Sequence, residues 1–262
     1  MRSKVLIWIA LLGCSTISYA QQLLSPDGNL EMNFRLDEKG APVYDLSYKQ
    51  KEVIKPSHLG LELKKEDADA AVDFEFKQRK DVDALDKKTN LYDGFRIKET
   101  RTSSFNETWQ PVWGEEKEIR NNYNELAVTL EQPSNDRSIV VRFRLFNDGL
   151  GFRYEFPQQE SMDSLVIMSE ETEFRMSGTH KAWWIPASDP YYECIATFSP
   201  INELDTVRTP LTMETAEGKY LTIHEANLTD YPKMNLTVKD SATLCASLVP
   251  WSNGVAAYIK AP

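Results

Sequence analysis

Apolar and polar residues alternate with a period of two over most of this chain. Leu30, Met32, Phe34 and Leu36 are each separated by one polar residue, and Ser138–Phe146 repeats the pattern. Such alternation places the apolar side chains on one face of an extended segment, which predicts half-buried β-strands. Short clusters of Gly, Pro, Asn and Asp separate the segments, and Asn147–Gly149 is a strong hairpin signal.

The pattern predicts more than a dozen short strands. They are Leu30–Leu36, Val43–Tyr48, Val53–Ile54, Ser57–Leu63, Val72–Phe76, Glu125–Glu131, Ser138–Phe146, Leu150–Phe156, Leu165–Met168, Glu173–Met176, Thr179–Trp184, two strands joined through Ala216–Gly218, then Asn235–Val238, Leu244–Leu248 and Gly254–Ile259. Pro and Gly around Trp109–Trp113 indicate an irregular loop or an edge strand there.

The fold class predicted is all-β, a large antiparallel β-sandwich of many short strands, in effect a super-sandwich. No segment has a convincing helical period over more than about two turns, and no internal repeat is visible. No Pro/Gly/Ser-rich linker interrupts the strands, so residues 21–262 are assigned to one domain.

Residues 1–20 are predicted to be a signal peptide. Arg2 and Lys4 precede a short apolar run, Val5–Leu12, and Ala20 ends a suitable cleavage site. Export to the periplasm follows, with no membrane span because the apolar run is too short. In the alternative, Cys14 is the lipid-bearing cysteine of a lipoprotein.

The composition is acidic, with 30 Lys and Arg against 40 Asp and Glu and a formal net charge of −10. That balance argues against binding to nucleic acid or to anionic membrane, and no basic block offsets it. Cys194 and Cys245 follow the signal segment, and the sequence leaves open whether they are buried thiols or one disulfide.

No catalytic set follows from standard signatures. His58, His180 and His224 show neither HExxH spacing nor pairing, and there is no Gly-x-Ser-x-Gly elbow. Four tryptophans could stack on sugar rings or, alternatively, fill a sandwich core or cap its rim: Trp109, Trp113, Trp183 and Trp184.

Several segments taken together resemble a known family. They are Ser25–Gly28, Ser57–Leu63, Trp109–Leu126, Phe143–Phe156, Tyr192–Glu193 and Thr209–Met234. In this order they are similar to the N-terminal domain of glycoside hydrolase family 97, which comprises bacterial α-glucosidases and α-galactosidases.

The resemblance implies a β-sandwich packed on a catalytic (β/α)₈ barrel, with a calcium ion in the active site. Glu193, preceded by Tyr192, matches the one glutamate that the sandwich gives to this ion. Calcium takes six to eight oxygen ligands, so the barrel must supply the others. Val207, Arg208 and Thr209 match a loop at the rim of the sugar site, although many relatives have asparagine at the position of Arg208. His224–Ala226 matches a further motif, expected to support the fold or the domain interface.

The chain stops near Pro262, where the family's barrel begins, so the barrel is expected to be absent and the chain alone inactive. We therefore predict a non-catalytic, carbohydrate-binding-type domain of an exported calcium-dependent α-glycosidase. An α-glucosidase acting on α-linked oligosaccharide is favoured, with the barrel as the partner. The alternatives are a free-standing carbohydrate-binding module and a structural surface sandwich without a ligand.

Overall fold

A computed structural model describes residues 20–64, 90–162, 164–189, 191 and 193–260. The signal segment, Cys14 and the strand expected at Val72–Phe76 lie outside the described residues. Within them the secondary structure is β throughout, apart from one 3₁₀ turn, η3 (Ile201–Glu203). The prediction of an all-β fold is confirmed.

The largest sheet has eight strands. In spatial order they are β1 (Gln21–Leu24), β2 (Leu30–Leu36), β3 (Pro42–Tyr48), β4 (Lys51–His58), β12 (Glu173–Met176), β19 (Thr243–Leu248), β18 (Met234–Val238) and β15 (Val207–Arg208). All of its pairings are antiparallel, and the first four strands form a simple meander. Buried residues of this large sheet pack with those of the other three sheets in the two hydrophobic cores.

Three four-stranded sheets complete the sandwich-like arrangement. The β7–β10 sheet contains β10 (Leu150–Glu155), β9 (Arg137–Leu145), β8 (Ile119–Gln132) and β7 (Arg96–Trp109). The β11 sheet contains β20 (Ala257–Lys260), β11 (Ser164–Glu170), β5 (Leu61–Leu63) and β6 (Asn90–Leu91). The β13 sheet contains β14 (Thr197–Pro200), β13 (Lys181–Trp184), β16 (Leu211–Glu214) and β17 (Tyr220–Ile223).

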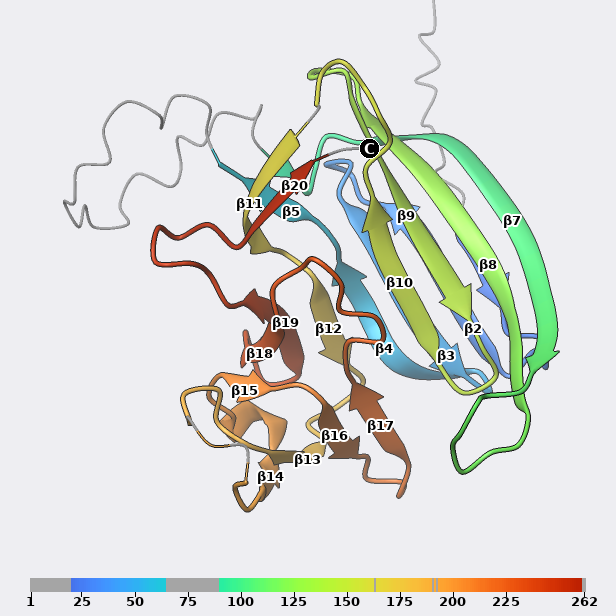
Figure 1. The fold of residues 1–262 in the computed structure, drawn as a ribbon, viewed down its shortest axis with the longest axis vertical. Helices are drawn as coiled ribbons and strands as arrows, with labels where there is room; N and C mark the ends of the chain where they lie inside the picture. The colour runs from blue at the N-terminus through green and yellow to red at the C-terminus, as the bar shows by residue number, and fades with distance from the viewer. Residues whose placement is uncertain (1–19, 65–89, 163, 190, 192, 261–262) are drawn as a thin grey trace, which may run out of the picture.

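The main core lies between β1–β4 and the β7–β10 sheet, which covers them in Figure 1. Strand β9 shows how the sequence forms this layer, because its residues are alternately buried and half-exposed. The inward Phe143 has its ring centroid 5.6 Å from that of Phe34 and 6.0 Å from that of Phe152. Aromatic side chains from facing sheets thus pack against each other in the interior.

A second core joins the other half of the large sheet to the β13 sheet at the lower end of Figure 1. Ala182, Leu211 and Met213 from the β13 sheet pack there with Val207 and Leu236 from the large sheet, and all five are fully buried. Because β15 belongs to this core, the residues that flank it are held on a rigid base.

Two of the differences from the predicted strands have identifiable reasons. The 14-residue strand β7 was missed because nearly all of its side chains are exposed, so no alternation marks it. The single strand expected at Ser57–Leu63 is two strands in different sheets, since β4 ends at His58 and β5 begins at Leu61. Between them, Gly60 packs so tightly that an added Cβ would lie 2.3 Å from the Tyr92 Cβ.

Candidate functional site

The loop of residues 185–196, here called the Glu193 loop, connects two neighbouring strands of the β13 sheet. Its ends are held together by the pairing of Trp184 with Thr197. Its first half runs beside β15, where the Arg208 N–H donates to the Ile185 carbonyl at 3.1 Å and the Ala187 N–H donates to the Thr206 carbonyl at 2.8 Å. The loop therefore starts from backbone that is fixed to the second core.

Glu193 itself is exposed on this loop. Among the described residues, its carboxylate makes no hydrogen bond or ion pair. Nor does that part of the chain contain a group of three or more His, Cys, Asp or Glu side chains placed to hold a metal ion. The carboxylate is thus presented outward with its oxygens available, and it is neither sealed inside the sandwich nor surrounded by other acidic ligands.

Polar contacts hold the residues on both sides of Glu193. One oxygen of Asp189 accepts the Tyr191 N–H at 3.0 Å, and the other accepts the Cys194 thiol at 2.9 Å. The thiol hydrogen bond is the largest cause that lowers the pKa of Asp189, followed by the Tyr191 N–H. The same contact with a carboxylate raises the pKa of the Cys194 thiol.

The Arg208 side chain reaches this network from β15. Its Nη1 donates to the Tyr191 carbonyl at 3.0 Å, and its positive charge contributes to the lowered pKa of Asp189. Arg208 therefore contacts the loop that carries Glu193, through the Tyr191 carbonyl.

The other two residues predicted at the sugar rim are turned elsewhere. The Val207 side chain is fully buried in the second core. The Thr209 hydroxyl donates to the Met234 carbonyl at 2.8 Å and lies 3.3 Å from a Glu225 oxygen. The second Glu225 oxygen accepts the Met234 N–H at 2.8 Å. Glu225 therefore ties the loop after β17 to β18, which is the fold-supporting role expected for its motif.

Sequence reasoning missed Asp189 and gave Cys194 no role in the site. The signal available was the Asp189–Pro190 dipeptide, because Asp before Pro is typical of turns in which the carboxylate caps nearby backbone N–H groups. The contact across 17 residues between Arg208 and Tyr191 has no local signal.

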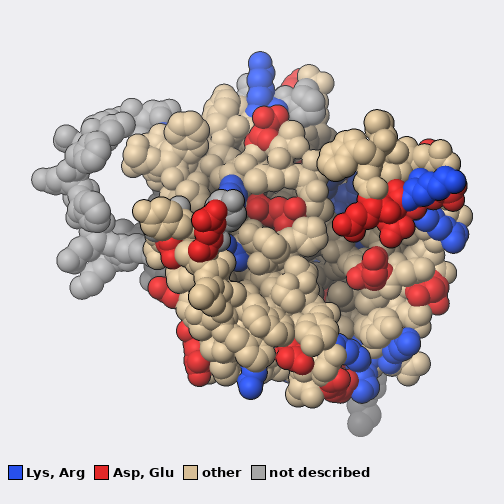
Figure 2. Space-filling view, turned by 60° about the horizontal axis from the view of Figure 1, so that its bottom comes forward, with Lys and Arg blue, Asp and Glu red and all other residues tan. Residues whose placement is uncertain are grey.

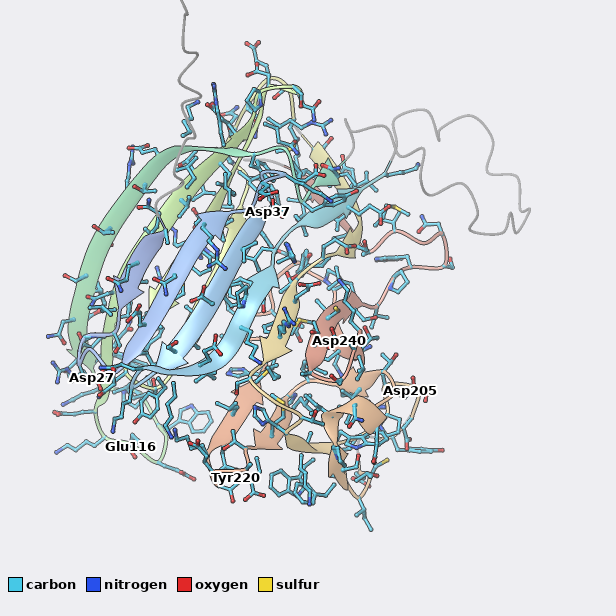
Figure 3. The ribbon with its side chains drawn as sticks, turned by 180° about the vertical axis from the view of Figure 1, so that it is seen from behind. Asp27, Asp37, Glu116, Asp205, Tyr220 and Asp240 are labelled. Carbon is cyan, nitrogen blue, oxygen red and sulfur yellow. The ribbon has the colours of Figure 1, made fainter. Side chains whose placement is uncertain are left out.

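Three of the four candidate tryptophans lie at the surface, and the fourth, Trp184, packs against the second core. Trp109, Trp113 and Trp183 are exposed and Trp184 is half-buried. The ring of Trp183 stacks on that of Phe198 with 4.3 Å between centroids, which occupies one of the faces that a sugar would need. Trp183 and Tyr220, whose centroids are 6.1 Å apart, belong to the end of the molecule that is labelled by Tyr220 in Figure 3, opposite Asp37.

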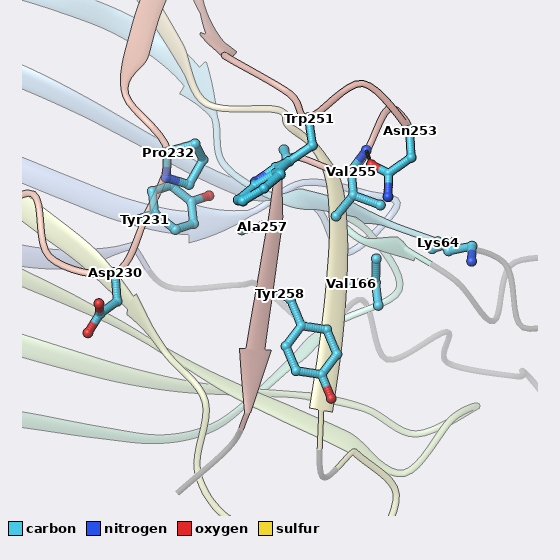
Figure 4. Close-up of a pocket in the computed structure, with 11 residues that line it drawn as sticks. Lys64, Val166, Asp230, Tyr231, Pro232, Trp251, Asn253, Val255, Ala257 and Tyr258 are labelled. Carbon is cyan, nitrogen blue, oxygen red and sulfur yellow. Dashed lines mark hydrogen bonds between the residues drawn. The ribbon is translucent and has the colours of Figure 1, made fainter.

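An open depression of about 630 Å³ lies on the outer face of the β11 sheet (Figure 4). Its lining includes Trp251 and Tyr258, which are 75% and 67% exposed, together with Tyr231. Asp230 and Asn253 add polar groups to its rim. Glu193 and the 207–209 segment do not line it, so it is separate from the Glu193 loop.

The surface chemistry agrees with the charge balance of the sequence. On the face seen in Figure 2, basic and acidic residues are interspersed and no broad basic field appears. Within the described ranges, no helix is long and apolar enough to cross a membrane. Cys194 and Cys245 are both free thiols, which resolves the alternative that the sequence left open.

Comparison with known proteins identifies the class of domain. The fold is that of the β-sandwich of certain glycoside hydrolases, since solved enzymes of this class superpose on more than nine-tenths of the chain. The chain belongs to the glycosyl-hydrolase 97 N-terminal domain family, whose sequence model matches residues 23–261. The resemblance inferred from the sequence is thereby confirmed.

Individual relatives are much longer than this chain. A glycoside hydrolase family 97 enzyme from Pseudoalteromonas sp. strain K8, solved in complex with panose, is 34% identical with a TM-score of 0.79, covering 92% of this chain and 34% of the enzyme. A retaining alpha-galactosidase of Bacteroides thetaiotaomicron is 21% identical over 268 residues, which cover 94% of this chain and 35% of that protein. A beta-arabinopyranosidase at 18% identity shares the fold, with a TM-score of 0.76. The chain spans about one third of the length of these relatives.

Proposed function

We propose that this N-terminal domain completes the active site of a calcium-dependent α-glycosidase by presenting Glu193 as one calcium ligand. The observation that carries the proposal is the exposed Glu193 carboxylate, unpaired among the described residues, on a loop whose neighbouring residues are held in place. A carboxylate kept free of partners on an otherwise bonded loop is suited to meet a partner from outside the domain.

The donor set fits calcium as a shared ion. Carboxylate oxygen is a hard ligand of the type that calcium prefers, but six to eight oxygens are needed. The described residues place no second acid beside Glu193 in a metal-binding group, so the remaining ligands must come from the catalytic barrel. When bound, the ion would supply positive charge to the active site.

The substrate proposed is an α-linked oligosaccharide, with α-glucosidase activity favoured. Support comes from the relative solved with panose, which is more similar in sequence than the retaining alpha-galactosidase. The guanidinium of Arg208 is the one side chain of the 207–209 segment that reaches toward the Glu193 loop, so we assign Arg208 to the rim of the sugar site, with Val207 and Thr209 anchoring the segment behind it. Residues 1–20 support export to the periplasm, with a lipid on Cys14 as the alternative.

The test uses a family 97 enzyme that contains both domains. Replacing the glutamate equivalent to Glu193 with Gln should weaken calcium retention by about tenfold or more, the scale seen when groups that support a metal are removed. Turnover of an aryl α-glucoside should fall in parallel and recover with excess calcium. If the dependence on free calcium is unchanged, Glu193 is not a ligand.

A second candidate, a carbohydrate-binding module, is favoured by the depression on the β11 sheet. Exposed Trp251 and Tyr258 offer apolar ring surface for the C–H face of a pyranose, and Asp230 and Asn253 can bond its hydroxyls. The volume of about 630 Å³ lies within the range of small-ligand sites, which is roughly 300–1,000 Å³.

Tryptophan fluorescence during titration with maltooligosaccharides separates this candidate from the first. Trp251→Ala should abolish a saturable change, whereas Trp113→Ala, which removes another exposed indole outside the depression, should keep it. Absence of a signal at millimolar sugar in the unmodified chain excludes the binding module.

A further inference from the structure

Ordering the Glu193 loop is a physical requirement of the proposed calcium site, on which this inference rests. Fixing the backbone of a residue has an entropic cost, and a carboxylate on a loose loop incurs that cost when it binds. Contacts that fix the loop beforehand therefore raise the affinity of its carboxylate for a cation. The question is which side chains supply them.

Asp189 bonds to residues on both sides of Glu193. Its two oxygens are divided between the Tyr191 N–H and the Cys194 thiol. These bonds close a ring from residue 189 to residue 194, with Glu193 inside it. The ring fixes the backbone around Glu193 without using the Glu193 carboxylate.

Arg208 joins this ring to the rest of the fold. Both backbone polar groups of Tyr191 are held, because its N–H donates to Asp189 and its carbonyl accepts Arg208 Nη1 at 3.0 Å. The same carbonyl lies 3.3 Å from the Cys194 sulfur. The Arg208 backbone pairs with Asn235 of β18, and the preceding Val207 is fully buried. The guanidinium thus fixes the Glu193 loop to a strand that is anchored in the second core.

We infer that Asp189, Cys194 and Arg208 form a clamp that positions Glu193 before any cation binds. In this assignment, Arg208 is a positioning residue for the metal ligand, in addition to any contact that it makes at the sugar rim. Asp189 and Arg208 carry opposite charges, which favours the closed arrangement. Cys194 acts as a hydrogen-bond donor, so its thiol chemistry is not required.

Hydrogen exchange followed by mass spectrometry tests the clamp in the metal-free chain. Arg208→Gln and Cys194→Ala should each speed exchange in peptides from the Glu193 loop, whereas Cys194→Ser, which keeps a donor, should restore wild-type protection. Arg153→Gln removes an exposed arginine of β10 and serves as the control. Equal protection of the loop in all four variants would overturn the clamp.

Terbium luminescence, with this ion as a calcium probe, tests the link to Glu193 in a family 97 enzyme that contains both domains and keeps the equivalents of Arg208 and Glu193. Arg208→Gln should weaken terbium binding about tenfold, equivalent to about 1.4 kcal/mol, and Glu193→Gln should weaken it at least as much. Unchanged affinity in Arg208→Gln would refute the positioning role. If Glu193→Gln binds terbium as wild type does, or wild type does not bind, the calcium proposal fails, while the exchange data still decide whether the clamp exists.

Discussion

Replacing Phe143 with Ala tests the main core most directly, because this ring lies where the two layers meet. Its side chain is fully buried and its centroid lies within 6.4 Å of those of Phe34, Tyr44 and Phe152. Truncating a buried phenylalanine costs about 3–5 kcal/mol, from lost transfer energy and from the cavity. For a domain of this length, that corresponds to a fall in melting temperature of roughly 6–20 °C.

The matched control is Phe105→Ala on β7 in the same sheet. This ring is 39% exposed and stacks on Tyr123 with 5.4 Å between centroids, so its loss should cost about 0.5–1.5 kcal/mol. Urea unfolding followed by circular dichroism gives both free energies without relying on a tryptophan signal. Equal losses for the two variants would refute the assignment of Phe143 to a dry layer between the sheets.

Two further predictions concern charge and backbone. Burial is the largest cause that raises the pKa of the Glu170 carboxyl, which accepts the Tyr231 hydroxyl at 2.9 Å. Because the pKa is higher in the folded state, protonation of Glu170 contributes to the unfolding free energy in full below the ordinary carboxyl pKa. This contribution is lost as pH rises through the raised pKa. Glu170→Gln should therefore flatten the decline of the unfolding free energy from weakly acidic to neutral pH, and a slope identical to wild type would count against it. Gly40→Ala should be destabilising by roughly 1–3 kcal/mol, because φ is +75° and the new Cβ would lie 2.5 Å from the Phe95 carbonyl oxygen, whereas Gly149→Ala meets no atom within 4 Å. Thermal melts of the pair decide, and equal shifts would contradict the close approach at Gly40.

The fold was predictable wherever one face of a strand is buried. Residues Leu30–Leu36 and the inward series that includes Phe143 were read correctly because burial on one side imposes alternation. Strand β7 could not be read this way, since its pairing with β8 comes from backbone hydrogen bonds that leave no apolar pattern. Local alternation also gives no information on which sheet a strand joins, hence the error at Ser57–Leu63.

The site was predictable in part only. Glu193 and the 207–209 segment were selected through family resemblance, and the structure adds that Arg208 bonds to the Glu193 loop. The contacts made by Asp189 depend on the conformation of an irregular loop, which residue spacing does not determine. The calcium ion and the α-glucosidase specificity stay predictions.

The charges of strand β7 also bear on self-association of the domain. It is the outermost strand of its sheet, and within the described part of the chain one edge of its backbone has no neighbouring strand. Arg96, Lys98, Glu99 and Arg101 place charges along this strand, and such side chains would have to be desolvated before another molecule could add a strand. The same polar side chains that leave β7 without an alternating pattern therefore disfavour self-association at this edge strand.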